Sequence, residues 1–316
     1  MKNYPSKKDI LEAHIRIKDL IHRTPVLTSD SINRITQTNL FFKCENFQKV
    51  GAFKMRGASN AVLSLPKEKL KNGVATHSSG NHAAALARAA KIAGTKAYIV
   101  MPHTAPRIKK EAVKGYGAEI TFCEPTLKSR EETLKIVVSK TGAEFVHPFN
   151  NYYIIAGQAT AAKEVFEKIK VNLDYLITPV GGGGLLSGSL LSAHYFSPST
   201  KVIGAEPCGA DDAFRSLRDG FIHPSIEPKT IADGLLTSLG EKSFAVITKY
   251  CEEIITVKEE TIIAAMKMIW ERMKIIVEPS STVVLAAVME NQNKFEGKNI
   301  ALILSGGNVD LEKLPW

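Results

Sequence analysis

Lys54 has the sequence setting in this chain that best fits covalent chemistry. It lies within residues 51–57, which read Gly-Ala-Phe-Lys-Met-Arg-Gly. Small neighbours and one aromatic ring let an amine approach both a flat molecule and the backbone. Lysine amines form Schiff bases with carbonyl groups. Taken alone, the stretch also fits the commoner case of a solvated surface lysine. Other motifs in the chain are needed to distinguish a Schiff-base lysine from a surface lysine.

A run of polar and small residues, Ser78-Ser79-Gly80-Asn81-His82, follows one predicted strand and opens a predicted helix. Free backbone N–H groups at a helix N-terminus attract anions such as a carboxylate. An ordinary N-cap would also place Ser or Asn here. Five such residues in succession exceed what capping requires, and we expect an anion-binding turn.

Four consecutive glycines, Gly181 to Gly184, lie between a predicted strand and a predicted helix. Such a turn can fold its N–H groups around a phosphate at the positive end of the helix. No Gly-Lys-Ser/Thr follows, so it is not a Walker loop, and the spacing of the dinucleotide fingerprint is absent. The alternative is a flexible turn.

Two further turns at predicted strand ends carry polar groups. Ser305-Gly306-Gly307-Asn308 offers a hydroxyl that can exchange a hydrogen bond with a ring nitrogen. Residues 206–212 carry the carboxylates of Glu206, Asp211 and Asp212, which could hold Mg²⁺ or Ca²⁺ or could cap a helix.

These turns belong to an alternation of short apolar segments and longer helical patterns. The predicted strands are residues 40–44, 73–77, 97–101, 119–122, 144–147, 175–180, 201–206, 253–257 and 299–304. The predicted helices are residues 82–93, 107–114, 128–140, 154–170, 185–195, 259–274 and 280–293. Strand–helix alternation predicts an α/β protein with open, twisted parallel sheets covered by helices, which bind ligands beyond the carboxyl ends of strands.

The order of these elements predicts two domains. Residues 73–150 hold four predicted strands, enough for a small α/β domain, and residues 1–72 and 151–316 would together form a larger one. No repeat or low-complexity linker divides them.

Composition narrows the class of protein. The 316 residues are 44% hydrophobic and 23% charged, as in ordinary globular proteins. The formal charge of +9 is dispersed, without a block of five or six like charges, which argues against nucleic-acid binding. Four scattered cysteines predict reduced thiols and a cytoplasmic protein. No run of eighteen apolar residues predicts a membrane span.

Together the motifs resemble the tryptophan synthase β-like, or fold-type II, pyridoxal phosphate enzymes. Within them the chain is similar to the serine/threonine dehydratase group, nearest to serine racemase and threo-3-hydroxyaspartate ammonia-lyase. The resemblance runs from Arg23-Thr24-Pro25-Val26 through residues 43–49 (Lys-Cys-Glu-Asn-Phe-Gln-Lys) to residues 305–310, in family order and spacing. It implies pyridoxal 5'-phosphate as cofactor, a small amino-acid substrate and a homodimer.

Carried over residue by residue, the resemblance implies that Lys54 forms the Schiff base. The other implied cofactor contacts are Phe53 and Gly234 on the two ring faces, Asn81 at the ring hydroxyl, Gly181, Gly182, Gly183 and Gly184 at the phosphate, and Ser305 at the ring nitrogen. The implied substrate-carboxylate residues are Ser78, Asn81, His82 and Arg130. The implied ligands of Mg²⁺, Ca²⁺ or Mn²⁺ are Glu206, Asp212 and the carbonyl of Ala210.

The implied reaction is the conversion of L-threonine, L-serine or 3-hydroxyaspartate to a 2-oxo acid and ammonia. Lys54, once free, would remove the Cα proton. Ser79 stands where many dehydratases of the group have alanine and where the racemases have serine. Ser79 would then exchange a proton on the face opposite Lys54, so serine racemase with side elimination is the alternative. His147, Asn150, Arg56 and Tyr152 are candidates to line the β-substituent.

Overall fold

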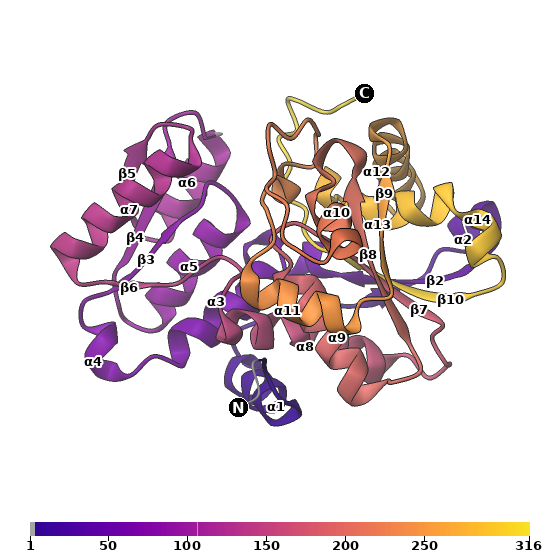
Figure 1. Ribbon diagram of the computed structural model, residues 1–316, viewed down its shortest axis with the longest axis horizontal. Coiled ribbons are helices and arrows are strands. Elements are labelled where there is room, and N and C mark those ends of the chain that lie inside the picture. The colour runs from indigo at the N-terminus through magenta and orange to yellow at the C-terminus, as the bar shows by residue number, and fades with distance from the viewer. Residues whose placement is uncertain (1–3, 106) are drawn as a thin grey trace.

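Two separate β-sheets organise the chain (Figure 1). The computed structural model describes residues 4–105 and 107–316. The larger sheet has the strand order β1-β2-β10-β7-β8-β9, and the smaller has the order β5-β4-β3-β6. The strands are β1 (Val26–Leu27), β2 (Asn39–Cys44), β3 (Val74–His77), β4 (Ala97–Pro102), β5 (Glu119–Cys123), β6 (Glu144–Phe145), β7 (Tyr175–Pro179), β8 (Lys201–Pro207), β9 (Glu253–Val257) and β10 (Asn299–Leu304).

Almost every pair of neighbouring strands is parallel, and only β1 runs antiparallel to β2. In β10, the five residues from Ile300 to Leu304 are completely buried, as expected for a strand covered by helices on both faces. All nine predicted strands are present. The largest difference is β6, which ends at Phe145 because its pairing with β3 stops there.

The helices cover the two sheets on both sides (Figure 1). They are α1 (Lys7–Ile17), α2 (Asp30–Thr36), α3 (Lys54–Leu63), α4 (Lys67–Leu70), α5 (Asn81–Ile92), α6 (Arg107–Gly115), α7 (Leu127–Thr141), α8 (Tyr152–Lys168), α9 (Gly184–Phe196), α10 (Asp212–Asp219), α11 (Glu241–Tyr250), α12 (Glu259–Met273), α13 (Pro279–Glu290) and α14 (Gln292–Phe295). The seven predicted helices are confirmed. Helices α1, α2, α3, α4, α10, α11 and α14 are additional; α3, which begins at Lys54, contains poor helix formers such as Gly57.

Close helix crossings explain those poor helix formers. A Cβ atom at Gly157 of α8 would lie 2.6 Å from the Cα of Gly57, and one at Gly188 of α9 would lie 2.6 Å from the backbone of Ala159. Glycine at these positions lets α8 pack directly on α3 and α9. Helix α3 therefore forms because of its packing, despite its weak intrinsic propensity.

A buried ionic cluster fixes α3 further. Arg56 donates to Glu45 at 2.7 and 2.8 Å and to Glu164 at 2.8 and 2.9 Å, and Lys43 donates to Glu164 at 2.6 Å. All four side chains are at least 98% buried. Burial alone would raise the pKa of Glu164, but hydrogen bonds and charge from Arg56 lower it to about 2. The cluster joins α3 to α8 and to the end of β2.

Three neighbouring strands of the larger sheet lead into three of the predicted site segments at one edge of the sheet. Strands β2, β10 and β7 are adjacent and parallel. They lead, respectively, into the segment of Lys54, into Ser305-Gly306-Gly307-Asn308 and into the glycines 181–184. Since the carboxyl ends of parallel strands share an edge, these segments meet there.

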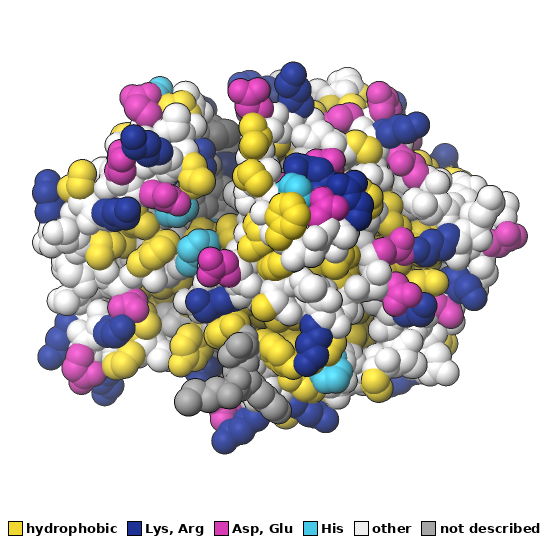
Figure 2. All heavy atoms as spheres, viewed as in Figure 1, with side chains coloured by type: hydrophobic (Ala, Val, Ile, Leu, Met, Phe, Trp, Pro, Cys, Tyr) yellow, Lys and Arg dark blue, Asp and Glu magenta, His cyan; other side chains and the backbone are white. Residues whose placement is uncertain are grey.

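The surface carries charges of both signs. Figure 2 shows Lys and Arg side chains interspersed with Asp and Glu over the visible face. Among the helices in the described residues, none has the length and hydrophobicity needed to cross a membrane.

Candidate active site

Lys54 is the first residue of α3, and its amine is held between backbone and an aromatic ring. The Nζ atom donates to the carbonyl of Pro148 at 3.2 Å and lies 5.2 Å from the centre of the Phe53 ring. Burial lowers the pKa of the Lys54 ammonium to about 8, and the carboxylate of Glu278 offsets part of this effect. The amine is therefore easily freed of its proton, as a nucleophile or general base requires.

The segment before Lys54 is hydrogen-bonded to the turn that contains Ser305. Phe53 N donates to the carbonyl of Ser305 at 3.0 Å, and Gly307 N donates to the carbonyl of Gly51 at 2.9 Å. Ser305 itself is buried, with its Oγ 3.1 Å from that of Ser281. The structure thus brings Phe53, Lys54 and Ser305 together.

Strained backbone marks the same segment. Val50 has a φ of 62°, which is rare for a β-branched residue. Its carbonyl accepts a hydrogen bond from Asn308 Nδ2 at 2.8 Å. Gly51 has a φ of 68°, and a Cβ atom there would overlap the Asn308 side chain. The side chain of Asn308 therefore holds this turn in its unusual conformation.

The glycine turn forms an open cradle of N–H groups. Gly183 has a φ of 83°, and a Cβ atom at Gly182 would overlap the ring of Phe149. Within the described chain, the N–H groups of Gly182, Gly183 and Gly184 have no acceptor. Gly184 begins α9, so the positive end of that helix faces the same space. Unpartnered donors at a helix N-terminus fit a phosphate group.

Gly234, the other residue predicted to flank the cofactor ring, lies against this turn. A Cβ atom at Gly181 would be 3.1 Å from the carbonyl oxygen of Gly234. The Gly234 N–H donates to Ser280 Oγ at 2.9 Å. Gly234 belongs to the short 3-10 helix of Asp233–Leu235.

Glu278 is a site residue that the sequence analysis missed. Its side chain is 98% buried and accepts two hydrogen bonds from Asn81 Nδ2, at 2.9 and 3.2 Å, and one from Asn308 N at 3.2 Å. Burial raises the pKa of Glu278 to about 7, with a further contribution from Asp233, while Asn81 opposes the shift. The sequence does mark this residue, because Glu278 is a charged residue that precedes Pro279 within an otherwise apolar stretch.

The turn of residues 78–82 opens α5 as predicted. The backbone N–H groups of Asn81 and His82 find no acceptor within the described residues. The His82 imidazole, in contrast, lies 3.3 Å from the Val146 carbonyl through Nε2, and burial lowers its pKa well below its usual range. If His82 binds a substrate carboxylate, it therefore does so through its backbone N–H group and not through its imidazole. Ser78 and Ser79 lie in the same turn.

Arg130 lies on α7, which packs against β3, the strand that leads into that turn. Among the described residues it makes no hydrogen bond through its side chain, and its Nε atom is buried without a partner. The prediction that Arg56 lines the β-substituent is wrong, because its guanidinium is fully buried and bound to Glu45 and Glu164. His147 does lie near Lys54, whose charge contributes to lowering its pKa.

Glu206, near the carboxyl end of β8, and Asp212, the first residue of α10, form a second cluster. Burial raises the pKa of Glu206 to about 9 and that of Asp212 to about 6. Asp212 Oδ2 is buried without a hydrogen-bond partner. Asp211, the third acid of this stretch, is instead hydrogen-bonded to Arg215 at 2.8 Å.

Glu206 also caps α10, because it accepts hydrogen bonds from Ala213 N at 3.3 Å and from Phe214 N at 2.6 Å. Helix capping, the alternative for these acids, is therefore present, and two buried carboxylates without an ion-paired cation also fit a divalent metal.

No three His, Cys, Asp or Glu side chains among the described residues form a metal-binding group. A metal here would therefore depend on two carboxylates, the carbonyl of Ala210 and water.

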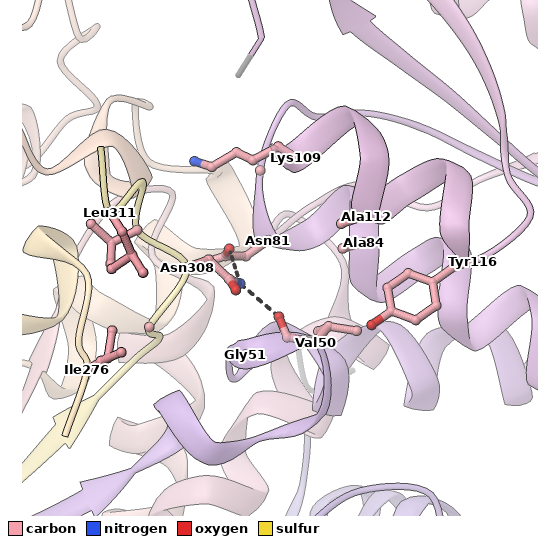
Figure 3. A pocket seen from close by; sticks show the side chains of 13 residues that line it. Val50, Gly51, Asn81, Ala84, Lys109, Ala112, Tyr116, Ile276, Asn308 and Leu311 are labelled. Carbon is pink, nitrogen blue, oxygen red and sulfur yellow. Dashed lines mark hydrogen bonds between the residues drawn. The ribbon is translucent and has the colours of Figure 1, made fainter. Parts of the chain in front are cut away.

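A pocket of about 420 Å³ opens on the outer side of Asn81 (Figure 3). Figure 3 shows the side chain of Asn308 hydrogen-bonded to Asn81 and to the Val50 carbonyl on one side of the pocket. Lys109 and Tyr116 line it from α6 and the turn after it. Asn81 and Asn308, which line this pocket, also donate hydrogen bonds to Glu278.

Comparison with known proteins assigns the chain to a family. Residues 17–306 match the family described as pyridoxal-phosphate dependent enzyme. The chain belongs to this family of enzymes. The predicted tryptophan synthase β-like fold and the predicted pyridoxal phosphate cofactor are confirmed by this match and by the solved structures it resembles.

Three relatives cover almost the whole chain. A beta-hydroxyaspartate dehydratase of Paracoccus denitrificans (strain Pd 1222) is 50% identical over 99% of both chains. The crystal structure of serine racemase from Dictyostelium discoideum is 50% identical, with a TM-score of 0.93 over 98% of this chain and 100% of the other. The crystal structure of a T.th. threonine deaminase is 41% identical, with a TM-score of 0.93 over 97% and 99%.

Proposed function

We propose that the protein is a pyridoxal phosphate-dependent ammonia-lyase that converts a β-hydroxy amino acid to a 2-oxo acid and ammonia. The observation that carries this proposal is the Lys54 amine, whose pKa burial lowers to about 8 and which lies on the segment hydrogen-bonded to Ser305. The similarity to a beta-hydroxyaspartate dehydratase supports the same reaction class.

The proposed roles follow the geometry of the site. Gly181, Gly182, Gly183 and Gly184 would hold the phosphate through unpartnered N–H groups, with Phe53 and Gly234 beside the ring and Ser305 at its nitrogen. Asn81 would face the ring hydroxyl, with its amide oriented by Glu278. The bound cofactor supplies an electron sink for the charge that develops at Cα.

The protein's own residues would then move the protons. The N-terminus of α5, with Ser78, Asn81 and His82, would orient the substrate carboxylate. Lys54 would accept the Cα proton, since its amine is unprotonated in a substantial fraction near its pKa of about 8. A neutral hydroxyl at Ser305, rather than a carboxylate, leaves the ring nitrogen less protonated, which favours prompt loss of the β-hydroxyl.

Serine racemase is the second candidate function, and Ser79 is the observation that favours it. It lies in the turn of residues 78–82, where a hydroxyl could exchange a proton on the face opposite Lys54. The similarity to a serine racemase at 51% identity over 97% of this chain is comparable support.

Product analysis distinguishes the two functions. The holoenzyme is incubated with L-serine, L-threonine or 3-hydroxyaspartate, and 2-oxo acid, ammonia and the opposite enantiomer are measured. We expect 2-oxo acid and ammonia to form in equal amounts and faster than any enantiomer. A D-serine rate well above the pyruvate rate would overturn the ranking. Lys54→Ala should lose both activities together with the visible absorption of the bound cofactor.

A divalent cation, Mg²⁺ or alternatively Ca²⁺ or Mn²⁺, would occupy the second cluster. Its ligands would be Glu206, Asp212 and the Ala210 carbonyl. Chelation should lower the melting temperature, and added Mg²⁺ should restore it, because the cation removes the cost of two buried carboxylates. Glu206→Gln should abolish this response, whereas Asp219→Asn, an exposed acid on the same helix as Asp212, should retain it. An unchanged response in Glu206→Gln would exclude the site.

The proposed assembly is a cytoplasmic homodimer in which residues 73–150 close over the substrate against residues 1–72 and 151–316. All four cysteines are free thiols, which supports a reducing compartment. Light scattering after size-exclusion chromatography tests the dimer, and solution scattering with and without substrate tests the closure.

A further inference from the structure

Two histidines line the side of the site that faces the smaller sheet. His77 is the last residue of β3, and His147 follows β6, the strand paired with β3. Their ring centres are 6.2 Å apart. His147 lies close enough to Lys54 for the charge of the amine to affect its pKa. The two rings therefore extend from the reacting centre toward the carboxyl ends of the smaller sheet.

His147 is held in one orientation and one protonation state. Its Nδ1 accepts hydrogen bonds from the backbone N–H groups of Phe149 and Asn150, at 3.3 and 3.0 Å. Burial lowers the pKa of His147 to about 4, with further contributions from His77 and Lys54. The ring is consequently neutral, and its one proton is on Nε2. It presents a single fixed N–H donor.

The segment that carries His147 is rigid. The Phe149 ring packs edge-on against the imidazole, with centres 4.6 Å apart, and fills the space beside Gly182. Asn150 Oδ1 accepts a hydrogen bond from Lys242 N at 2.8 Å. A donor on such a segment discriminates between substrates because it cannot move to suit each one.

Arg130 adds a positive charge to this side. Helix α7 packs against β3, with Leu134 of α7 against Ala75 of β3, so the first turn of α7 brings Arg130 toward His77. The charge of Arg130 adds to the lowering of the His77 pKa by burial, and Glu131 opposes it. Among the described residues, no carboxylate forms an ion pair with Arg130, and its Nε is buried without a partner. A partly buried guanidinium with unused donors is a site for an anion.

The carboxylate of Glu278, whose charge acts on Lys54, already has hydrogen-bond partners. Glu278 is bound by Asn81 and by Asn308 N. The α-carboxylate of an amino acid has its own place at the N-terminus of α5, on the turn of residues 78–82. A β-hydroxyl or β-methyl group of serine or threonine would leave Arg130 unpaired, whereas a β-carboxylate would pair with it.

We propose that Arg130 and His147, beside His77, bind a second carboxylate, so that the preferred substrate is a β-hydroxy amino dicarboxylic acid of the 3-hydroxyaspartate class. This inference rests on the proposed ammonia-lyase function. The resemblance implied that Arg130 binds the α-carboxylate of the substrate; here Arg130 binds the β-carboxylate instead. In the reaction the Cα–H and Cβ–O bonds break, water leaves, and water is consumed on hydrolysis, so the net products are a 2-oxo dicarboxylic acid and ammonia.

Steady-state kinetics of the holoenzyme test the assignment. We expect wild-type kcat/KM to be at least about tenfold higher for 3-hydroxyaspartate than for L-serine. Arg130→Gln should reduce kcat/KM for 3-hydroxyaspartate by about 10–100-fold, the loss of a charge-assisted hydrogen bond, and should change that for L-serine less than about threefold. His147→Leu should act in the same direction, and His147→Gln, which keeps a neutral donor, should lose less.

L-Serine turnover is the internal control for folding, and Arg34→Gln, at an exposed arginine on α2, is the matched charge control.

Inhibition of the wild-type enzyme by amino acids tests the second carboxylate site without any variant. Aspartate, which lacks the leaving hydroxyl, should inhibit at least about tenfold more tightly than alanine.

The outcomes separate this inference from the proposed function. Equal inhibition by aspartate and alanine, or equal losses for both substrates in Arg130→Gln, would refute the second carboxylate site while the lyase function stands. Absence of 2-oxo acid from every substrate would refute the lyase function itself.

Discussion

Glu278 and Asn81, 197 residues apart in the chain, are joined by two hydrogen bonds from one amide nitrogen to both carboxylate oxygens. This contact connects the turn that opens α5 with the residue preceding α13. It fixes the direction of the Asn81 amide, whose Oδ1 accepts from Asn308 Nδ2 at 2.9 Å. Asn81 is thus oriented before any ligand binds.

Replacing Glu278 by Gln should remove an acid limb from the pH profile. Glu278 accepts from Asn81 through both of its oxygens only as a carboxylate, and burial raises its pKa to about 7. Wild-type kcat/KM should therefore rise with pH through about 7, and Glu278→Gln should lack this rise. At pH values above the limb we expect a loss of about tenfold, the difference between a charged and a neutral acceptor. An unchanged limb would assign it to another group.

Asp233 should set the position of that limb. Asp233 raises the pKa of Glu278, and it is ion-paired with Lys109 of α6. Asp233→Asn removes a negative charge and frees Lys109, and both changes favour ionised Glu278. The acid limb of kcat/KM should move to lower pH. Lys128→Gln, at an exposed pair on α7, serves as control and should leave the limb in place. A shift to higher pH in Asp233→Asn would contradict the proposed coupling.

The rate of cofactor binding to cofactor-free protein should be half-maximal near pH 8. Only the unprotonated amine of Lys54 attacks a carbonyl, and burial lowers the pKa of this amine to about 8. The rate should rise with pH through about 8 and then level off, whereas an unperturbed lysine would give a rise through about pH 10. Stopped-flow absorbance measures the rate. Glu278→Gln removes a charge that favours the ammonium, so its plateau should begin at lower pH.

Arg56→Met should destabilise the protein strongly. The substitution leaves Glu45 and Glu164 buried without their main cation, which costs about 3–5 kcal/mol in comparable buried pairs. The urea midpoint should fall accordingly. Lys8→Met at the exposed Lys8–Glu12 pair should change stability by less than about 1 kcal/mol. Equal midpoints for the two variants would show that the buried cluster contributes little.

The sequence alone predicted the parts of the site that local chemistry marks. The strands were recognisable because both faces of a parallel sheet are covered, which selects runs such as residues 299–304. The turns were recognisable because glycine and small polar residues follow those strands directly, as in Gly181 to Gly184. Parallel strands then require these turns to share one edge.

Other features depended on contacts between distant segments. Helix α3 contains Gly57 because α8 approaches it at Gly157, and no local pattern reports that crossing. The sequence around Arg56 also fits a substrate residue, but its guanidinium is bound by Glu45 and Glu164, whose positions in the chain do not predict this contact.

The sequence by itself therefore determined the strand-end turns, because these depend on residue types at short spacing, and it determined the family and the cofactor through a resemblance that runs from residue 23 to residue 310. Only the tertiary structure decided that Glu278 orients Asn81 and that Arg130 is left without a carboxylate among the described residues. The protonation state and the free donors of a side chain depend on burial and on partners far away in the sequence, and folding alone brings those partners together.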